Sequence, residues 1–244
     1  MRVALLGATK GMGRALARAM AARGDALVLL GRDAADLERS ARDLEVRGGA
    51  RIATAACDLE RPETFGSALA AAEAALGGLD AVVVTAGLFA TQDRLEADSA
   101  LTQRLLLVDF TNTVCFCEEA RRRLLAGGGG TLCVFSSVAG ERGRKPVVLY
   151  GAAKAGLTRY LEGLDHRFRA AGLRTVCVKP GFVRTSMTDG LPAPPFAGEP
   201  EGVARRVLRA IDDGTPVVYV RGAWRWVMLV IRALPRFVMR RVAF

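Results

Sequence analysis

Tyr150 and Lys154 are the residues whose types and spacing point most directly to chemistry. They lie four positions apart, so on a helix both side chains share one face. A tyrosine exchanges protons poorly near neutral pH because its ordinary pKa is about 10, and a neighbouring ammonium group lowers that pKa by stabilising the phenolate. Ser136 and Ser137 come shortly before, at the end of an apolar run, where a hydroxyl can hold a carbonyl oxygen beside the tyrosine. Together these residues predict proton transfer to or from a carbonyl or alcohol oxygen.

A glycine-rich turn near the N-terminus predicts a site for a dinucleotide. It follows the first apolar run, residues 2–6, and leads into a helix that is expected to begin near Arg14. In such a turn, backbone N–H groups and the helix N-terminus can face a pyrophosphate, and glycine permits the close approach. The spacing is G-x3-G-x-G rather than the usual G-x-G-x-x-G, so a turn without a ligand is the alternative interpretation. The expected contacts are Gly7, Thr9, Lys10, Gly11, Met12 and Gly13.

The end of the second apolar run predicts which cofactor is bound. An acidic residue there would bond a ribose 2′-hydroxyl and repel a 2′-phosphate, but this run ends at Gly31, and Arg32 follows. Arg32, helped by Lys10, therefore favours NADP(H) through charge-assisted bonds to the phosphate; an exposed surface arginine is the alternative. Asp58, after the third run, is expected either to bond the adenine amino group or to cap a helix, and Leu59 to contact the cofactor.

Short apolar runs alternate with longer helical patterns along most of the 244 residues. Runs that are apolar throughout predict strands buried on both faces, and their alternation with helices predicts a doubly wound, Rossmann-type α/β fold with a parallel sheet of about seven strands. Asp33 suits the N-cap of the second helix. The expected strands are residues 2–6, 27–30, 51–57, 81–85, 131–136, 174–179 and 217–220, and the expected helices are 14–23, 34–47, 62–76, 101–125, 150–171 and 201–212. We expect one catalytic domain, residues 1–220, followed by a basic amphipathic tail, residues 221–244.

Composition excludes several classes of protein. With 51% hydrophobic residues the chain is too apolar to be disordered, yet no run approaches the roughly 18 apolar residues of a membrane span. A single histidine, His166, and the absence of a Cys-x-x-Cys pair predict no metal site and no disulfide framework. The net charge of +10 favours an anionic partner or surface, but 6% aromatic residues and no recognisable module argue against nucleic acid. We expect a cytoplasmic protein whose reduced cysteines are small core residues, namely Cys57, Cys115, Cys117, Cys133 and Cys177.

In this order the motifs resemble those of the short-chain dehydrogenase/reductase family, and the resemblance covers essentially the whole chain. The family's serine lies thirteen residues before its tyrosine, which selects Ser137 over Ser136. The other matching positions are Gly7, Gly11 and Gly13 of the glycine motif, Thr85-Ala86-Gly87 in place of Asn-Ala-Gly, and Pro180, Gly181, Val183 and Thr185 of the turn that closes over the nicotinamide.

The resemblance implies hydride transfer between NADP(H) and a ketone or secondary alcohol. In the reducing direction Ser137 would hold the carbonyl oxygen, Tyr150 would donate its proton, and Lys154 would lower the tyrosine pKa and bond the ribose. Ala86 and Gly87 would also contact the cofactor, and a homodimer or homotetramer is the family's habit. A non-catalytic dinucleotide sensor or scaffold with the same fold is the alternative, because fold alone does not guarantee activity.

One position departs from the family pattern. The helical asparagine that orders a water beside the lysine falls at Asp109 in this chain. An ionised acid accepts hydrogen bonds but cannot donate them. Asp109 is therefore expected either to compete with Tyr150 for the Lys154 ammonium or to redirect the proton relay, whereas Asn112 is expected to point to another part of the helix surface.

Three segments resemble one bacterial branch of the family more closely: residues 139–145, 179–187 and 224–241. That branch contains the reductase of decaprenylphosphoryl keto-pentose, which implies a lipid-linked keto-sugar as substrate. Arg142, Arg144 and Lys145 would then hold the phosphate, although a solvated basic loop explains them equally well. The alternative is a soluble carbonyl or acyl-chain ketoreductase whose tail only builds the oligomer.

The tail combines a narrow cationic stripe with a broad apolar face, and no acidic residue follows Asp213. A helix of this kind suits the interface of an anionic membrane, with arginines at the head groups. We expect either peripheral attachment to the inner face of the plasma membrane or packing against the chain's own domain or a partner subunit. Pro235 is expected to break the tail into two pieces. The stripe consists of Arg225, Arg232, Arg236 and Arg240.

Overall fold

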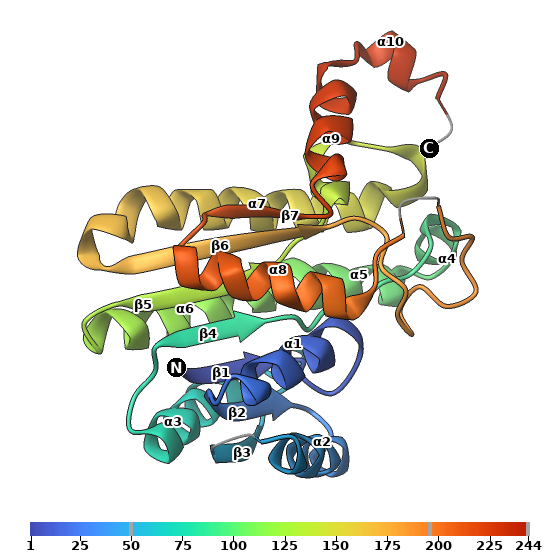
Figure 1. The fold of residues 1–244 in the computed structure, drawn as a ribbon. Coiled ribbons are helices and arrows are strands. Elements are labelled where there is room, and N and C mark those ends of the chain that lie inside the picture. The colour runs from blue at the N-terminus through green and yellow to red at the C-terminus, as the bar shows by residue number, and fades with distance from the viewer. Residues whose placement is uncertain (49–50, 195–196, 243–244) are drawn as a thin grey trace.

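Seven parallel strands form one sheet in the order β3-β2-β1-β4-β5-β6-β7, which confirms the fold class expected from the sequence (Figure 1). The structure is a computed structural model that describes residues 1–48, 51–194 and 197–242. The chain winds from β1 to one edge of the sheet and then from β4 to the other, so the strand order reverses between β1 and β4. The strands are β1 Arg2–Leu6, β2 Ala26–Gly31, β3 Arg51–Ala56, β4 Ala81–Val84, β5 Gly130–Phe135, β6 Leu173–Pro180 and β7 Val217–Val220.

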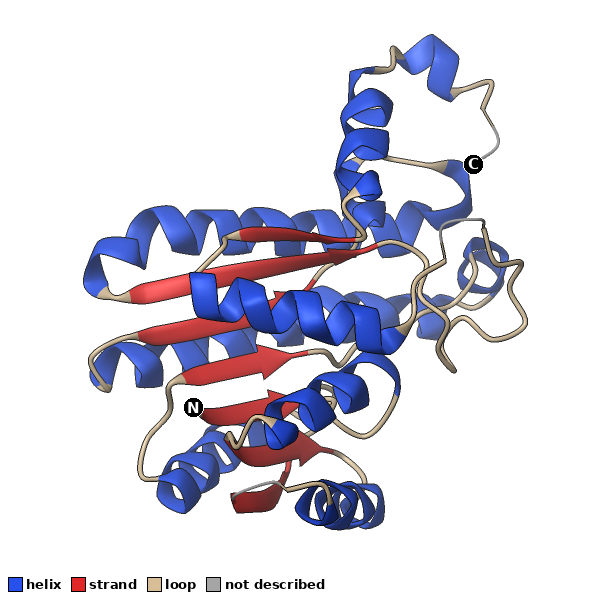
Figure 2. Ribbon diagram, in the orientation of Figure 1, coloured by secondary structure: helices blue, strands red, loops and turns tan. Residues whose placement is uncertain are grey.

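Helices cover both faces of this sheet (Figure 2). On one face α1, α2 and α8 bury their apolar sides, and on the other α3, α6 and α7 do so. The helices are α1 Gly11–Ala22, α2 Ala34–Val46, α3 Thr64–Leu76, α4 Gln92–Ala97, α5 Ser99–Leu106, α6 Asn112–Ala126, α7 Val148–Phe168, α8 Pro200–Asp213, α9 Ala223–Ala233 and α10 Arg236–Met239.

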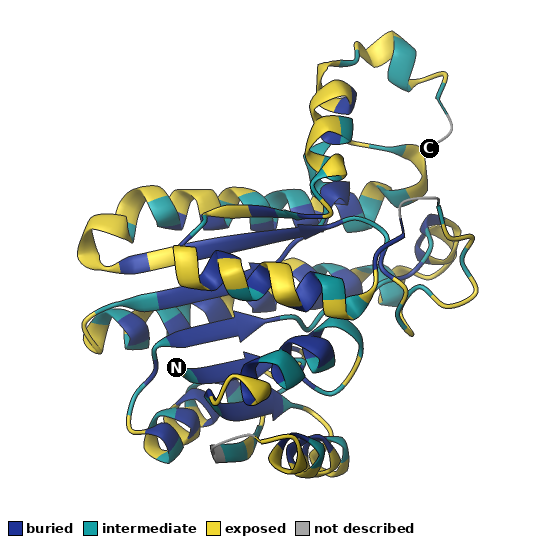
Figure 3. Cartoon of the chain, in the orientation of Figure 1, coloured by how far each residue is buried: buried dark blue, intermediate teal, exposed yellow. Residues whose placement is uncertain are grey.

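The two-sided cover explains why the strands are apolar without alternation. In β1, Val3 and Leu5 pack with the layer of α1, while Ala4 and Leu6 pack with the layer of α3. All four side chains are almost completely buried, and so are those of the neighbouring strands (Figure 3). The sheet is therefore a rigid platform whose C-terminal edge can hold a site in fixed geometry.

Several boundaries differ from the expectations. The helix expected at 101–125 is divided into α5, a π-helix η1 (Leu107–Thr111) and α6, and the short α4 was not expected because it has no apolar period. Helix α1 begins at Gly11 rather than near Arg14, since the glycines of the turn themselves form its first turn. Cys115 is exposed, contrary to expectation, because it lies on the face of α6 that points away from the sheet, whereas the other four cysteines are buried. The expected cap of α2 is confirmed: the Asp36 backbone N–H donates to the Asp33 carboxylate at 2.9 Å.

The tail forms two helices beyond β7, of which α9 packs against η2 (Val138–Glu141) and β7 and α10 lies farther from the sheet (Figure 1). The chain turns at Arg221, a non-glycine residue with a positive φ of 62°, whose Nη1 donates to the Ala197 carbonyl oxygen at 2.7 Å. Pro235 separates α9 from α10, as the sequence predicts. Among the described helices, none combines the length and apolar character that crossing a membrane requires.

Candidate active site

The glycine turn lies at the C-terminal edge of the sheet, close against the end of β4. Gly7 has a φ of +94°, and a Cβ atom there would lie 2.5 Å from the backbone N of Ala86. A Cβ at Gly13, in the first turn of α1, would lie 2.1 Å from the Gly7 carbonyl oxygen. Only glycine fits either position, so the turn and the N-terminus of α1 stay pressed against the sheet. This is the geometry in which backbone N–H groups can bind a phosphate.

Thr85 takes the place of the family's asparagine and supports this turn directly. Its Oγ1 lies 3.1 Å from the Leu6 carbonyl oxygen and 3.0 Å from that of Gly7, and its hydroxyl donates to these acceptors. The substitution therefore keeps a side-chain donor between β4 and the end of β1.

A cavity of about 220 Å³ opens beside the turn, where β1, β2 and β3 end. The side chain of Asp58 accepts a hydrogen bond from the Glu60 backbone N–H at 3.0 Å, so it stabilises its own turn, and no helix begins there. Size and position fit the adenosine half of a dinucleotide, with the glycine turn at one end. Of the residues expected to contact the cofactor, this cavity is lined by Gly7, Thr9, Arg32, Asp58, Leu59, Ala86 and Gly87.

Two arginines and two acidic residues line this cavity, namely Arg32, Arg104, Asp58 and Glu60. Arg32 is largely exposed, and its Nη1 lies 3.5 Å from an oxygen of Glu60. Arg104 of α5, which the sequence did not single out, makes two bonds to the same carboxylate at 2.9 and 2.6 Å and holds the pKa of Glu60 below its usual value. Lys10 is more distant, with its Nζ 3.9 Å from Asp36. Two guanidinium groups thus share the Glu60 carboxylate, and Asp58 lines the same cavity.

The structure separates the two serines that follow β5. The Ser136 hydroxyl is buried, donates to the Lys154 carbonyl oxygen at 2.9 Å and lies 2.7 Å from the Thr158 hydroxyl, so it joins β5 to α7. Ser137 precedes the 3-10 turn η2 (Val138–Glu141), its Oγ accepts from the Ala139 backbone N–H at 3.1 Å, and its hydroxyl is near enough to Tyr150 to act downward on the phenol's pKa. Of the two serines, Ser137 is thus the one whose hydroxyl acts on Tyr150, in agreement with the expected choice.

Helix α7 brings Tyr150 and Lys154 to the same site. The Lys154 Nζ lies 5.6 Å from the centroid of the Tyr150 ring and donates to the Phe135 carbonyl oxygen at 3.4 Å. Phe89 packs edge-on against Tyr150, with ring centroids 5.1 Å apart. The phenol is thus fixed between an aromatic ring, a serine hydroxyl and an ammonium group.

Asp109 is completely buried in the π-helix η1, and it faces the lysine. One carboxylate oxygen accepts from the Leu88 backbone N–H at 2.6 Å, and the other lies 3.5 Å from the Lys154 Nζ. The expected proximity of this acid to Lys154 is confirmed. Asn112, one turn on, points elsewhere as expected, because its Nδ2 donates to the Leu59 carbonyl oxygen at 2.6 Å.

The electrostatics of the site correct one expectation. Burial raises the pKa of Tyr150, and the Asp109 charge raises it further; the Lys154 ammonium and the Ser137 hydrogen bond act in the expected downward direction but do not prevail. Burial alone would lower the pKa of Lys154, but the charges of Asp109 and Tyr150 hold it above its usual value. The pKa of Asp109 is raised by its burial. The protein alone therefore keeps the phenol protonated, in the form that donates a proton.

A larger cavity of about 850 Å³ lies beyond Ser137 and Tyr150. Its walls are mainly apolar, and Arg144 is the one charged residue among the described residues that line it. The tail supplies one wall: the Trp224 indole lies so close to Gly181 that a Cβ on that glycine would meet its Nε1 at 2.1 Å. Of the residues expected around the nicotinamide, this cavity is lined by Met12, Pro180, Gly181, Val183 and Thr185, and the tail adds Trp224, Val227 and Ile231.

The remaining basic residues of the loop before α7 are dispersed. Arg142 turns to the tail, where its guanidinium donates to the Leu234 carbonyl oxygen at 2.8 Å. Lys145 lines a neighbouring pocket that shares Phe89, Pro146 and Phe182 with the large cavity. The structure therefore brings only Arg144 of this group into the large cavity.

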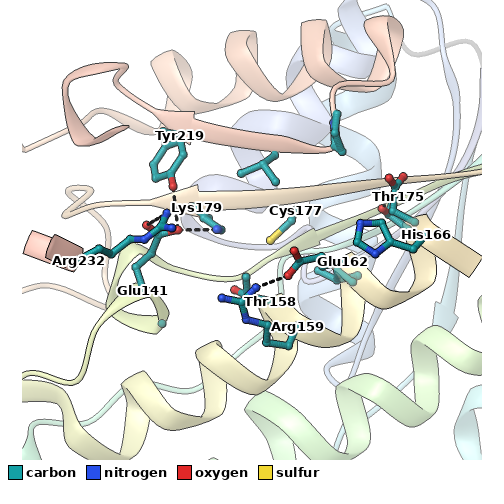
Figure 4. A pocket seen from close by; sticks show the side chains of 15 residues that line it. Glu141, Thr158, Arg159, Glu162, His166, Thr175, Cys177, Lys179, Tyr219 and Arg232 are labelled. Atoms are coloured by element: carbon teal, nitrogen blue, oxygen red, sulfur yellow. Dashed lines mark hydrogen bonds and ion pairs between the residues drawn. The ribbon is translucent and has the colours of Figure 1, made fainter. Parts of the chain in front are cut away.

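A buried ionic cluster lies behind the serine turn, at another pocket, of about 350 Å³ (Figure 4). Glu141, the last residue of η2, accepts from the Lys179 Nζ at 2.5 Å and from the Tyr219 hydroxyl at 2.8 Å. Arg232 of α9 approaches its second oxygen to 3.7 Å. Burial and the bond to Glu141 raise the pKa of Tyr219 to about 12. One carboxylate thus links the serine turn, β6, β7 and the tail, which the sequence did not predict.

Comparison with protein families decides the classification. A family model described as short chain dehydrogenase matches residues 2–194. The chain belongs to the short-chain dehydrogenase family. An uncharacterized oxidoreductase of Mycobacterium tuberculosis is 34% identical over 240 residues, which cover 98% of this chain and 96% of that protein. The alignment with this relative extends into the tail, which the family model does not reach.

Other members with known names or structures agree with the family assignment. The cis-4-hydroxycyclohexanecarboxylate dehydrogenase of Sinomonas cyclohexanicum is 33% identical and covers 79% of this chain and 77% of its own length. A short-chain dehydrogenase/reductase structure from Mycobacterium ulcerans superposes with a TM-score of 0.83 at 22% identity, covering 98% of this chain and 97% of that one. A variant of actinorhodin polyketide ketoreductase with NADPH has a TM-score of 0.82 at 22% identity, covering 91% and 97%. At this identity the two structures support the fold alone.

Proposed function

We propose that this oxidoreductase uses NADPH to reduce a ketone that carries a large apolar group, or oxidises the corresponding secondary alcohol. The observation that supports the proposal is the position of Ser137, Tyr150 and Lys154 between two cavities. The smaller one fits the adenosine half of a dinucleotide, and the larger, mainly apolar one has room for a long substrate. The bound nicotinamide would supply the hydride.

The chain's own residues supply position and the proton. The Ser137 hydroxyl holds the carbonyl oxygen beside the Tyr150 phenol, which is protonated because its pKa is raised. As the carbonyl carbon accepts the hydride, the phenol O–H bond breaks and its proton moves to the carbonyl oxygen, giving the alcohol. The phenolate left on Tyr150 is stabilised by the buried Lys154 ammonium, which Asp109 keeps charged.

The preference for NADPH over NADH is supported by the charges at the end of β2. The strand ends at Gly31, so no carboxylate is placed there to repel a 2′-phosphate. Arg32 and Arg104 lie at that edge, and the exposed Arg32, whose Nη1 is 3.5 Å from Glu60, can turn to a phosphate. Arginine bonds phosphate oxygens through charge-assisted pairs.

The apolar cavity supports a substrate longer than a small ketone. Its volume falls at the upper end of what drug-sized ligands occupy, and Arg144 offers an anchor for one anionic group. A lipid-linked keto-sugar, as in the branch that the sequence resembles, combines an apolar chain with a phosphate. The Sinomonas relative's name describes a secondary alcohol that carries a carboxylate, which Arg144 would suit equally well.

The test is NADPH consumption by the purified protein with a panel of ketones, and with Tyr150→Phe. The panel should contain 4-oxocyclohexanecarboxylate, a long-alkyl ketone in micelles and a prenylphosphoryl keto-pentose. We expect turnover with the long substrates, and a loss of roughly a hundredfold or more in kcat for Tyr150→Phe with unchanged NADPH affinity.

Tyr160→Phe is the matched control, because Tyr160 lies on the same helix but donates to Glu118 at 2.8 Å, away from the site. Equal losses in the two variants would show that the role of Tyr150 is misassigned. NADPH binding without turnover of any ketone or alcohol would favour a sensor or scaffold instead. Turnover of small ketones alone would contradict the proposal that the substrate carries a large apolar group.

A further inference from the structure

Helix α9 has two different apolar faces. One face, Trp224, Val227, Met228 and Ile231, packs inward, and Met228 is completely buried. This inward face also walls the large cavity. The inner face is therefore covered by the chain's own domain, as one of the expected arrangements of the tail predicts.

The opposite face of α9 is apolar and exposed. Trp226, Leu229 and Val230 are exposed by 66%, 55% and 62%. They are spaced as i, i+3 and i+4, so they form one continuous strip along the helix. Phe237 of α10, 60% exposed, adds to the apolar surface of the tail. Figure 3 shows α9 largely in the colour of exposed residues, and α10 in the colours of exposed and intermediate ones. Large apolar side chains gathered in this way are costly in water and mark an interaction surface.

The charge beside this strip is entirely positive in the sequence. No acidic residue follows Asp213, whereas arginines recur through both helices at positions 225, 232, 236, 240 and 241. Arg232 is partly engaged, since it approaches Glu141, which revises the four-arginine stripe expected from the sequence. The guanidinium of Arg225 lies 6.0 Å from the Trp226 ring. An apolar strip with tryptophan, bordered by arginines, complements a surface that is apolar inside and anionic at its rim.

We propose that α9 and α10 dock on an anionic lipid membrane, with Trp226, Leu229 and Val230 in the interface and the arginines at the head groups. A second copy of the chain is a poorer occupant, because tail-to-tail contact would bring two all-cationic segments together. In this position the membrane lies against the outer face of the same helix whose inner face walls the large cavity. The proposal concerns a surface and does not depend on the reaction, because binding can be measured without substrate.

The experiment is flotation of the full-length protein with vesicles of phosphatidylcholine alone and of phosphatidylcholine with phosphatidylglycerol. We expect the protein to float with the anionic vesicles and to remain behind with the neutral ones. Trp226→Ser/Leu229→Ser/Val230→Ser should reduce the floating fraction about tenfold or more, and Arg236→Gln/Arg240→Gln should reduce it as well. These side chains are exposed, so the fold should persist, and circular dichroism checks it.

Two control variants match these changes elsewhere. Val46→Ser/Leu107→Ser removes exposed apolar side chains from the body, and Arg39→Gln/Arg42→Gln removes two exposed charges from α2. Both controls should float like the unaltered protein. Flotation that is equal for the tail variants and the controls would overturn the proposal. So would sedimentation showing that the triple serine variant dissociates an oligomer without lipid, since the strip would then be a subunit interface.

Discussion

Asp109 is the residue that most distinguishes this site from the pattern it resembles. Its buried carboxylate pairs with Lys154, holding the lysine charged, and at the same time opposes ionisation of Tyr150. The charge of Asp109 therefore has two opposite effects on the proton relay: it keeps the Lys154 ammonium that stabilises a phenolate, and it disfavours that phenolate directly. At neutral pH the arrangement favours the protonated phenol, which is the form that the proposed reduction requires.

Asp109→Asn should shift the pH dependence of alcohol oxidation to lower pH. In that direction Tyr150 must be a phenolate, and removing a negative charge lowers the pKa of the phenol, by roughly one unit. The asparagine oxygen can keep the hydrogen bond from the Leu88 N–H. The measurement is kcat/KM for a secondary alcohol with NADP⁺ across pH. Asp93→Asn, an exposed acid of α4, should leave the profile unchanged, and an unshifted or upward-shifted Asp109→Asn profile would contradict the assignment.

Arg32→Ala should weaken NADPH binding about tenfold and leave NADH binding nearly unchanged, because the guanidinium is expected to meet only the 2′-phosphate. Fluorescence titration of both cofactors measures this directly. Arg42→Ala is the control, since Arg42 is equally exposed but pairs with Glu38 on the outer side of α2. If Arg32→Ala weakened the binding of NADPH and of NADH equally, Arg32 would not contact the 2′-phosphate.

At the scale of residues, the sequence could predict what depends on local spacing. Ser137, Tyr150 and Lys154 meet because a strand end and one helical face bring them together. The sign of the Tyr150 pKa shift could not be predicted, because it is decided by burial and by Asp109, both set by tertiary packing. Arg104 was missed for the same reason: it reaches Glu60 from α5, 44 residues away.

At the scale of elements, strands were predicted closely and interrupted helices were not. A strand buried on both faces shows as a continuous apolar run, so its ends are readable. The π-helix η1 has no such signal, because helical periodicity continues through it while its backbone bonds change. Asp109 lies within η1, so the interruption falls at a residue that faces the site.

The turn η2 depends on a buried charge pair that can be tested. Glu141→Gln should lower the free energy of unfolding by about 3 kcal/mol, because it leaves the buried Lys179 ammonium without a counter-charge. Urea denaturation measures this change. Glu162→Gln is the control, since Glu162 pairs with Arg159 at an exposed position where such a pair is worth under about 1 kcal/mol. Equal stabilities of the two variants would mean that the cluster does not hold the serine turn in place.

At the scale of the whole molecule, the tail changes what the common fold can bind. The sheet and its helices follow from the alternating pattern, and they position the dinucleotide site as in any doubly wound fold. The path of α9 could not be predicted from its amphipathic pattern, because that pattern fits packing and exposure equally well. The answer is both: one face completes the large cavity and the other remains exposed.

The wall that α9 contributes gives a prediction that compares two tryptophans of one helix. Trp224→Ala should raise KM for a long-alkyl ketone about tenfold, since removing an apolar contact of this size costs roughly 1.5 kcal/mol. Its kcat should change little, because Trp224 is not expected to touch the carbonyl. Trp226→Ala, on the outer face, should leave both constants unchanged in the absence of lipid.

Steady-state kinetics with short and long ketones separates the cases: the effect of Trp224→Ala should be confined to the long substrate. An equal rise of KM for the short ketone would mean instead that the indole supports the Pro180–Gly181 turn rather than the substrate chain.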